Sequence, residues 1–196
     1  MDNLPEWKKN QRKQLIAARE AVSQSLHQQW SRSISDHLIQ GFPQLQNLTI
    51  GIYWPFRGEY DPRAIAGYLL QQKATLALPE VVTKNEPLVF REWLPETPMK
   101  MGAYDIPVPC ETSTVRLDAI IIPMVGFDYQ GYRLGYGSGY YDRTLATYPQ
   151  QPLTIGVAFE IQRLENIHPQ LHDIAMQFIV TEAGIFQSHN HHLRAL

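Results

Sequence analysis

The feature that most constrains the fold is a continuous apolar run, LDAIIIPMVGF, at Leu117–Phe127. No polar residue follows Asp118 in this run, whereas a strand with one solvated face alternates apolar and polar residues. The run is therefore typical of a strand buried on both faces of a parallel sheet. A second run, LTIGVAF at Leu153–Phe159, predicts another buried strand, and QFIVTE at Gln177–Glu182 predicts the last one.

Helical patterns lie between these strands. Glu6–Gln40 carries apolar residues at helical spacing, with one interruption expected near Ser23–Ser25. The segment Asp61–Gln72 begins with Asp-Pro, a strong start signal, because aspartate caps a helix and proline fits its first turn. A short helix is expected over Tyr141–Tyr148. The chain thus alternates between helices and strands.

The remaining segments complete the predicted fold. Strands are expected in Leu48–Phe56, Ala74–Val81 and Pro87–Trp93, whereas Pro98–Pro109 is too rich in proline and glycine for a regular element. No internal repeat, low-complexity block or linker divides the chain, so we expect one domain over residues 1–196. The predicted fold class is α/β, a three-layer sandwich with a mainly parallel central sheet, open and Rossmann-like.

Composition excludes several classes of protein. Hydrophobic residues make up 44% of the chain and charged residues 18%, as in an ordinary folded protein. A net charge of −2 argues against broad nucleic-acid binding, and the single cysteine, Cys110, allows no intramolecular disulfide or thiolate cluster. No apolar run is long enough to span a membrane, and the N-terminus lacks the apolar core of a signal peptide. We therefore expect a cytoplasmic protein, and a monomer, since no sustained exposed apolar stripe is visible.

The stretch RLGYGSGYYDR, at Arg133–Arg143, places three glycines at every second position between two arginines. Glycines let a backbone curl closely around a ligand, and arginines and free N–H groups favour an anion. Asp142 is negative, and a bound metal ion would reconcile it with an anion site. The spacing matches neither the dinucleotide fingerprint nor the P-loop. A tight turn that needs glycine for geometry alone stays open at this point.

A longer stretch, GFDYQGYRLGYGSGYYDR, resembles the signature of the 5-formyltetrahydrofolate cyclo-ligase family, also called methenyltetrahydrofolate synthetases. Four further segments match the family in the right order, and the similarity spans Lys8 to Glu182. They are KKNQR, which holds Lys8 and Arg12, with Arg19 at a commonly basic position; YWPFRGEYD at Tyr53–Asp61; MGAYDIPVP at Met101–Pro109; and HDIAMQFIVTE at His172–Glu182.

The resemblance implies an ATP site built from the N-terminal basic residues and the glycine loop. Cationic side chains and backbone N–H groups would pair with phosphate oxygens there. Ser138 departs from the glycine or lysine often found at its position, so it brings a hydroxyl without charge. From the residues alone, a solvated basic helix face is the favoured interpretation of Lys8 and Arg12. The implied ATP-binding residues are Lys8, Arg12, Arg133, Gly135, Gly137, Ser138, Gly139, Tyr140, Tyr141 and Asp142.

The resemblance also implies a Mg²⁺ site at Asp142 and Asp173. Mg²⁺ commonly takes one or two carboxylates and completes its shell with water and phosphate oxygens. Without the resemblance, Asp142 reads equally well as a carboxylate favoured by a helix N-terminus, and Asp173 reads as a surface residue.

The implied folate-binding residues are Trp54, Glu59 and Tyr104. A carboxylate at Glu59 suits the adjacent N–H donors of a pterin, and the two flat rings would pack against the pterin or aminobenzoyl group. The alternatives are a surface glutamate and simple core packing of the rings.

The activity implied by the resemblance is conversion of 5-formyltetrahydrofolate to 5,10-methenyltetrahydrofolate. The reaction consumes ATP, depends on Mg²⁺, and releases ADP and phosphate. No catalytic side chain is identified, and the histidines His189, His191 and His192 read as a solvated end. Two alternatives remain: an enzyme that uses the same ATP site on another formamide or carboxylate, and a non-catalytic folate or nucleotide binder.

Overall fold

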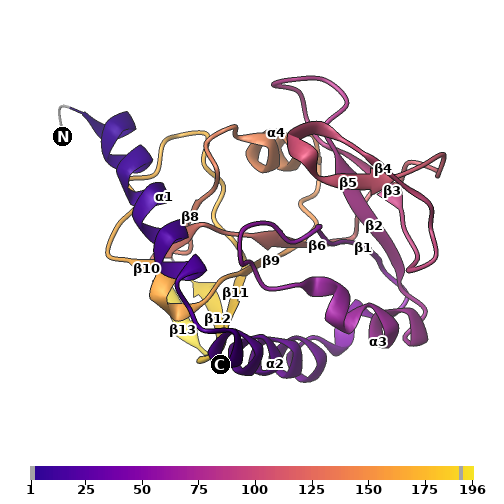
Figure 1. Ribbon diagram of the computed structural model, residues 1–196, viewed down its shortest axis with the longest axis horizontal. Helices are drawn as coiled ribbons and strands as arrows, with labels where there is room; N and C mark the ends of the chain where they lie inside the picture. The colour runs from indigo at the N-terminus through magenta and orange to yellow at the C-terminus, as the bar shows by residue number, and fades with distance from the viewer. Residues whose placement is uncertain (1–2, 190–191) are drawn as a thin grey trace.

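The computed structural model describes residues 3–189 and 192–196 and is built around one eight-stranded sheet (Figure 1). The strand order is β13-β12-β11-β9-β6-β1-β2-β3, and the five strands from β11 to β2 are parallel. Antiparallel strands complete both edges. The bounds are β1 Thr49–Gly51, β2 Thr75–Glu80, β3 Val89–Glu92, β6 Ala119–Pro123, β9 Leu153–Val157, β11 Phe178–Thr181, β12 Gly184–His189 and β13 His192–Ala195.

Helices cover both faces of this sheet, which confirms the predicted α/β class. Helices α2 (Gln24–Gly41) and α3 (Ala66–Gln71) lie on one side in Figure 1, and α4 (Tyr140–Ala146) lies on the other. One apolar cluster fills the α2 and α3 side, with Ile34 and Leu38 among its buried residues. A second cluster lies on the α4 side. The central strands are buried on both faces, as their unbroken apolar runs predict.

Helix α1, Leu4–Glu20, lies apart from this sandwich. Its Leu15 and Ile16 pack with Val125 and Leu134 in a third, smaller cluster. The predicted break between the two N-terminal helices is confirmed, because α2 begins after Ser23, whose side chain accepts a hydrogen bond from the Leu26 N–H group. A separate packing surface therefore holds α1 over the loops that follow β6.

The helix predicted at Asp61–Gln72 is also present, although its first turn is tighter. Asp61 caps the segment by accepting from the Arg63 N–H group at 3.0 Å. Pro62–Ile65 then forms a 3-10 turn, and α3 continues from it. Among the described residues 3–189 and 192–196, no helix is both long and apolar enough to cross a membrane.

Four expectations about strands need correction. The run Leu117–Phe127 forms two strands, because β6 stays in the main sheet while β7 (Gly126–Asp128) joins a three-stranded sheet. All residues of β7 are buried, so burial continues across the change from one sheet to the other. The partners of β7 are β8, Arg133–Leu134, and β10, Arg163–Leu164. The strand expected over Leu48–Phe56 is confined to β1.

The other two corrections concern segments read as irregular. Pro98–Pro109 contains a small antiparallel pair, β4 (Met99–Met101) and β5 (Pro107–Pro109), joined across the 3-10 turn Ala103–Asp105. The polar end of the chain forms the β12–β13 hairpin, in which His189 pairs with His192. Its exposed positions gave a weak strand pattern, because only part of each strand packs on the core. His191 lies outside the described residues.

Candidate active site

Helix α1 carries the two N-terminal basic residues to the loops beyond the sheet. Lys8 Nζ lies 3.6 Å from Asp173 Oδ2, and Arg12 donates from Nε to the Gly135 carbonyl at 2.7 Å. Lys8 and Arg12 are four residues apart, so both project from one face of the helix. The Lys8 side chain is only 15% exposed, so the reading of a freely solvated basic face is wrong for it. The structure thus joins four predicted ATP and metal residues from three distant parts of the chain.

The glycine loop requires glycine at two of its three positions. Gly137 has φ +103° and Gly139 has φ +64°, conformations that residues with a Cβ rarely adopt. A Cβ on Gly137 would also lie 3.3 Å from Arg12 Cζ, whereas nothing within 4 Å would meet one on Gly135. Gly139 is the residue that precedes α4. The loop therefore has a defined turn geometry, with the Arg12 guanidinium against its inner side.

Asp142 and Arg133 form a close pair behind this loop. Arg133 donates to Asp142 Oδ1 at 2.6 Å and to the Ile174 carbonyl at 2.8 Å, and its side chain is nearly buried. The Ile174 N–H group donates to the same Asp142 oxygen at 3.2 Å. Asp142 Oδ2 has no hydrogen-bond donor among residues 3–189 and 192–196. Arg133 thus already has protein partners, while Asp142 Oδ2 has none in the described part of the chain.

Asp173 lies next to this pair, because its neighbour Ile174 contacts both Arg133 and Asp142. Its Oδ2 accepts from the Gln170 N–H group at 2.7 Å and lies near Lys8. Within the described part of the chain, no group of three or more histidine, cysteine or acidic residues gathers to hold a metal. Two carboxylates of this kind fit Mg²⁺, whose remaining ligands are commonly water and phosphate.

Glu59 is buried, which excludes the reading of a surface glutamate. The residue is 6% exposed, and its Oε2 accepts from the Phe56 N–H group at 2.9 Å. Its Oε1 accepts from the Tyr136 hydroxyl at 2.7 Å and lies 3.8 Å from Arg19 Nη2. Burial raises the pKa of Glu59, and Arg19, Tyr136 and the Phe56 N–H group oppose that rise.

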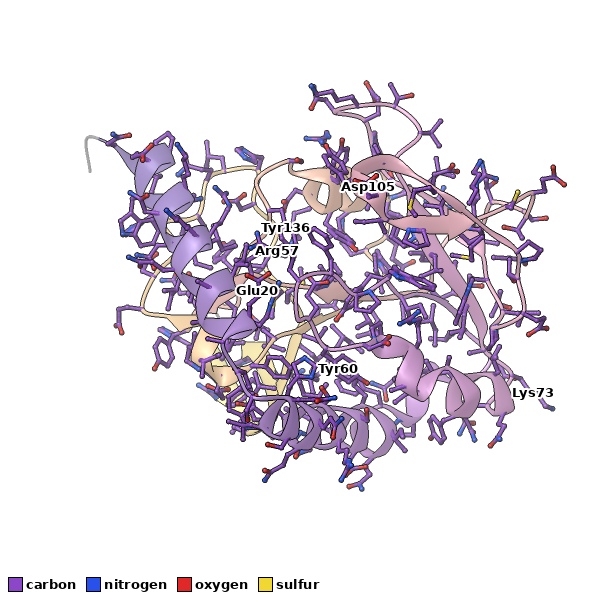
Figure 2. The ribbon with its side chains drawn as sticks, in the orientation of Figure 1. Glu20, Arg57, Tyr60, Lys73, Asp105 and Tyr136 are labelled. Atoms are coloured by element: carbon purple, nitrogen blue, oxygen red, sulfur yellow. The ribbon has the colours of Figure 1, made fainter. Side chains whose placement is uncertain are left out.

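Two residues without a predicted site role, Arg19 and Tyr136, hold this arrangement together. Arg19 is 1% exposed and donates to the carbonyl of Arg57 at 2.9 Å and to the Tyr136 hydroxyl at 2.9 Å. Figure 2 shows Tyr136 beside Arg57 and Glu20, where the end of α1 meets the loops. The helix spacing of Arg19 from Lys8 was a usable signal, whereas nothing in the sequence distinguished Tyr136 from a loop spacer.

The aromatic residues predicted for folate binding lie in two places. Trp54 stacks against the Arg63 guanidinium at 3.8 Å and, with Trp93 and Met99, lines a hollow of about 440 Å³. Tyr104 is exposed, which excludes core packing, and its hydroxyl lies 3.1 Å from that of Tyr140. The turn between β4 and β5 thus contacts the first residue of α4, which directly follows the glycine loop.

The two remaining predicted residues are Tyr141, in the first turn of α4, and Ser138, in the glycine loop. Tyr141 packs against the apolar cluster on the α4 side, and burial raises its pKa. The Ser138 carbonyl accepts from Arg143 at 2.6 Å. The contact with Arg143 holds the loop backbone where it enters α4, and the Tyr141 ring holds the first turn of α4 on the core.

A model of the 5-formyltetrahydrofolate cyclo-ligase family matches residues 5–182. The chain belongs to this family. The cyclo-ligase of Haemophilus influenzae is 33% identical over 156 residues, covering 76% of this chain and 83% of that protein. The cyclo-ligase of Escherichia coli is 28% identical over 178 residues, covering 86% of this chain and 97% of that protein. Membership of the cyclo-ligase family identifies the chain as an enzyme of the ligase class.

Solved structures agree with this membership. The 5,10-methenyltetrahydrofolate synthetase of Aquifex aeolicus is 30% identical and superposes with a TM-score of 0.80, covering 96% of this chain and 95% of that one. The synthetase of Mycoplasma pneumoniae is 26% identical with a TM-score of 0.74, covering 89% of this chain and 98% of that one. The fold class and the family predicted from the sequence are therefore confirmed.

Proposed function

We propose that this member of the cyclo-ligase family converts 5-formyltetrahydrofolate to 5,10-methenyltetrahydrofolate, using ATP and Mg²⁺ and releasing ADP and phosphate. The observation that carries the proposal is convergence: Lys8 and Arg12 of α1, the Gly135–Gly139 loop and the carboxylates of Asp142 and Asp173 meet at one place. These segments are distant in sequence, and cations, loop amides and carboxylates together suit a metal-bound phosphate chain.

The nucleotide side of the site is the glycine loop with α1. The Arg12 guanidinium lies against Gly137, and Lys8 reaches Asp173 nearby. These cations, with loop N–H groups, would hold phosphate oxygens of ATP. The Ser138 hydroxyl lies in the same loop, and the Tyr140 ring lies at the start of α4. Arg133 serves this site by orienting Asp142 through the 2.6 Å contact.

Asp142 and Asp173 would hold Mg²⁺, Asp142 through its unpaired Oδ2. The ion supplies charge neutralisation on the phosphoryl group that is transferred. Lys8 already lies beside Asp173, so a cation and a carboxylate are both available to the same phosphate oxygens.

The folate side of the site is centred on Glu59. An ionised Glu59 would accept from the adjacent N–H donors of the pterin, and Arg19 favours that ionised form. The hollow beside Trp54 would offer flat aromatic walls to the rest of the folate, and the exposed ring of Tyr104, beside Tyr140, would pack against it.

The chemistry needs positioning more than it needs a reactive side chain. The formyl oxygen takes the γ-phosphoryl group of ATP, N10 of the folate attacks the activated formyl carbon and loses its proton, and the oxygen departs as phosphate. The chain would hold the two substrates in line and stabilise charge on the phosphoryl group through Lys8, Arg12 and the loop amides. No side-chain nucleophile takes part in these reaction steps, and we assign no general base.

The test is absorbance at the methenyl band with 5-formyltetrahydrofolate, ATP and Mg²⁺, each omitted in turn. Product should form only when all three are present. ATP hydrolysis without stimulation by 5-formyltetrahydrofolate would favour an enzyme acting on another formamide or carboxylate. Binding of both ligands without product would favour a binder.

A matched variant locates the folate. Glu59→Gln keeps the shape of the side chain but removes a charge-assisted hydrogen bond, which costs about 1.5–3 kcal/mol, or roughly ten- to a hundredfold in folate affinity. ATP affinity measured without folate should hardly change. Unchanged folate affinity would refute the role of Glu59.

The proposal also includes a single-domain, cytoplasmic monomer, and gel filtration tests its oligomeric state.

A further inference from the structure

A single hydroxyl group connects the two substrate sites. The Tyr136 hydroxyl accepts from Arg19 Nη2 at 2.9 Å and donates to Glu59 Oε1 at 2.7 Å. Arg19 and Glu59 are 1% and 6% exposed, whereas Tyr136 is 42% exposed. A tyrosine at the surface of the glycine loop thus extends its hydroxyl into a buried pair of opposite charges.

The direction of these hydrogen bonds is fixed by chemistry. A guanidinium only donates and an ionised carboxylate only accepts, so the hydroxyl must receive one hydrogen bond and give the other. Hydrogen bonds in such a chain polarise one another, and each is stronger for the presence of the next. The position of the Tyr136 hydroxyl therefore affects the orientation and charge of Glu59.

Tyr136 also occupies a constrained position in the loop. It lies between Gly135, whose carbonyl accepts from Arg12, and Gly137, which has φ +103° and lies beside the Arg12 guanidinium. A phosphate that binds Arg12 and the loop amides would hold these two residues in place, and Tyr136 with them. Binding of a nucleotide would then change the orientation of Glu59 through the side chain of Tyr136.

We propose that Tyr136 is a positioning residue that couples the two sites, so that ATP bound at the glycine loop orients Glu59 for the pterin. The inference rests on the proposed function. Coupling of this kind is reciprocal, so folate would tighten ATP binding by the same factor. Tyr136 itself touches neither reacting atom in this scheme.

The groups facing Glu59 support a specific effect of the hydroxyl. Arg19 comes from α1, Tyr136 from the glycine loop and the Phe56 N–H group from the loop after β1, while the rings of Tyr53 and Tyr141 also lie near. Burial raises the pKa of Glu59 and the first three groups lower it. Removing the hydroxyl would therefore raise that pKa further.

The decisive variant is Tyr136→Phe, which keeps the ring and removes only the hydroxyl. Tyr129→Phe is the matched control, because Tyr129 is similarly exposed, at 49%, and its ring lies against Arg163, away from Glu59. The affinity for 5-formyltetrahydrofolate is measured with and without a non-hydrolysable ATP analogue and Mg²⁺. The analogue should tighten folate binding roughly 5- to 150-fold in the wild type and control, the usual range for coupled sites. In Tyr136→Phe the ratio should fall toward one.

An equal ratio in Tyr136→Phe and wild type, or a wild-type ratio of one, would overturn the coupling. A second measurement needs no ligand: carbon-13 NMR of the Glu59 carboxyl should give a higher pKa in Tyr136→Phe than in wild type or control. An unchanged pKa would refute the connection from Tyr136 to Glu59. If the wild type binds both ligands but forms no methenyl product, the proposed reaction fails, while the binding ratio still decides the coupling.

Discussion

Replacing Arg19 by methionine tests how the buried charge of Glu59 is stabilised. The two side chains are similar in length, so Arg19→Met keeps most of the packing along α1 while it removes the guanidinium. Three main-chain carbonyls lose a donor, those of Arg57 at 2.9 Å and of Met124 and Phe56 at 3.4 Å each. Glu59 loses the cation that lies 3.8 Å away and keeps its own burial.

The expected loss follows from that burial. Removing one partner of a buried ion pair typically costs about 3–5 kcal/mol, because the remaining charge is left without compensation. The two 3.4 Å contacts are long and add little to this figure. A domain of this kind is stable by roughly 5–15 kcal/mol, so Arg19→Met should remain folded but clearly weakened.

The loss should also depend on pH. A carboxyl whose pKa is raised on folding holds more protons folded than unfolded between its two pKa values, so the free energy of unfolding falls as pH rises through that interval. Burial already raises the pKa of Glu59, and Arg19 is the largest influence that opposes the rise. Without Arg19 the interval extends to higher pH, and the deficit should be larger at pH 7 than at pH 5.

Urea denaturation at both pH values measures these quantities. Arg57→Met is the control, because Arg57 pairs with Glu20 at 2.8 Å but both side chains are about 40% exposed, at 43% and 40%. Loss of such a surface pair typically costs about 0–1 kcal/mol. Equal losses for the two variants, or a loss at Arg19 that is independent of pH, would refute the reasoning.

Two further variants test the nucleotide and metal parts of the proposed site, and a third tests a buried carboxylate of β7. Gly137→Val should weaken ATP binding and leave folate affinity without ATP unchanged in a binding assay, because a branched side chain opposes φ +103° and meets Arg12. Asp142→Asn should keep the fold by circular dichroism but greatly reduce turnover, with partial recovery at high Mg²⁺. If this variant turned over at the wild-type rate at limiting Mg²⁺, the assignment of Asp142 to the metal would be contradicted. Asp128→Asn should lose about 1–3 kcal/mol in urea denaturation, because Asp128 is buried and accepts from three main-chain N–H groups.

The sequence predicted the main sheet well where burial alone decides the pattern. The strands β6 and β9 are buried on both faces, and their continuous apolar runs have the length expected of a buried strand. The division of Leu117–Phe127 between two sheets was not predictable, because hydrophobicity reports burial and says nothing of the hydrogen-bond partner. The hairpin β12–β13 was missed because its polar, partly exposed strands resemble a solvated tail.

The candidate site shows a similar division. Resemblance led to Lys8, Arg12 and the glycine loop, and the structure brings them together. Arg19 had only its helix spacing from Lys8 and its commonly basic position as signals, and Tyr136 had none. The partners of both residues lie far along the chain, and the two residues themselves are 117 positions apart. A buried arginine is recognised only when its partners are known, since arginine is mostly exposed in folded proteins.

Helix α1 supplies a cation to each part of the proposed site. Lys8 contacts Asp173, Arg12 contacts the glycine loop and Arg19 contacts the environment of Glu59. These residues follow one face of a rigid helix, which rises about 1.5 Å per residue, so the first and last are separated by roughly 16 Å along its axis. The metal, nucleotide and folate parts of the site are therefore held at fixed separations by one element. Because α1 packs through its own small apolar cluster and not through the main core, any shift of the helix must move all three contacts together.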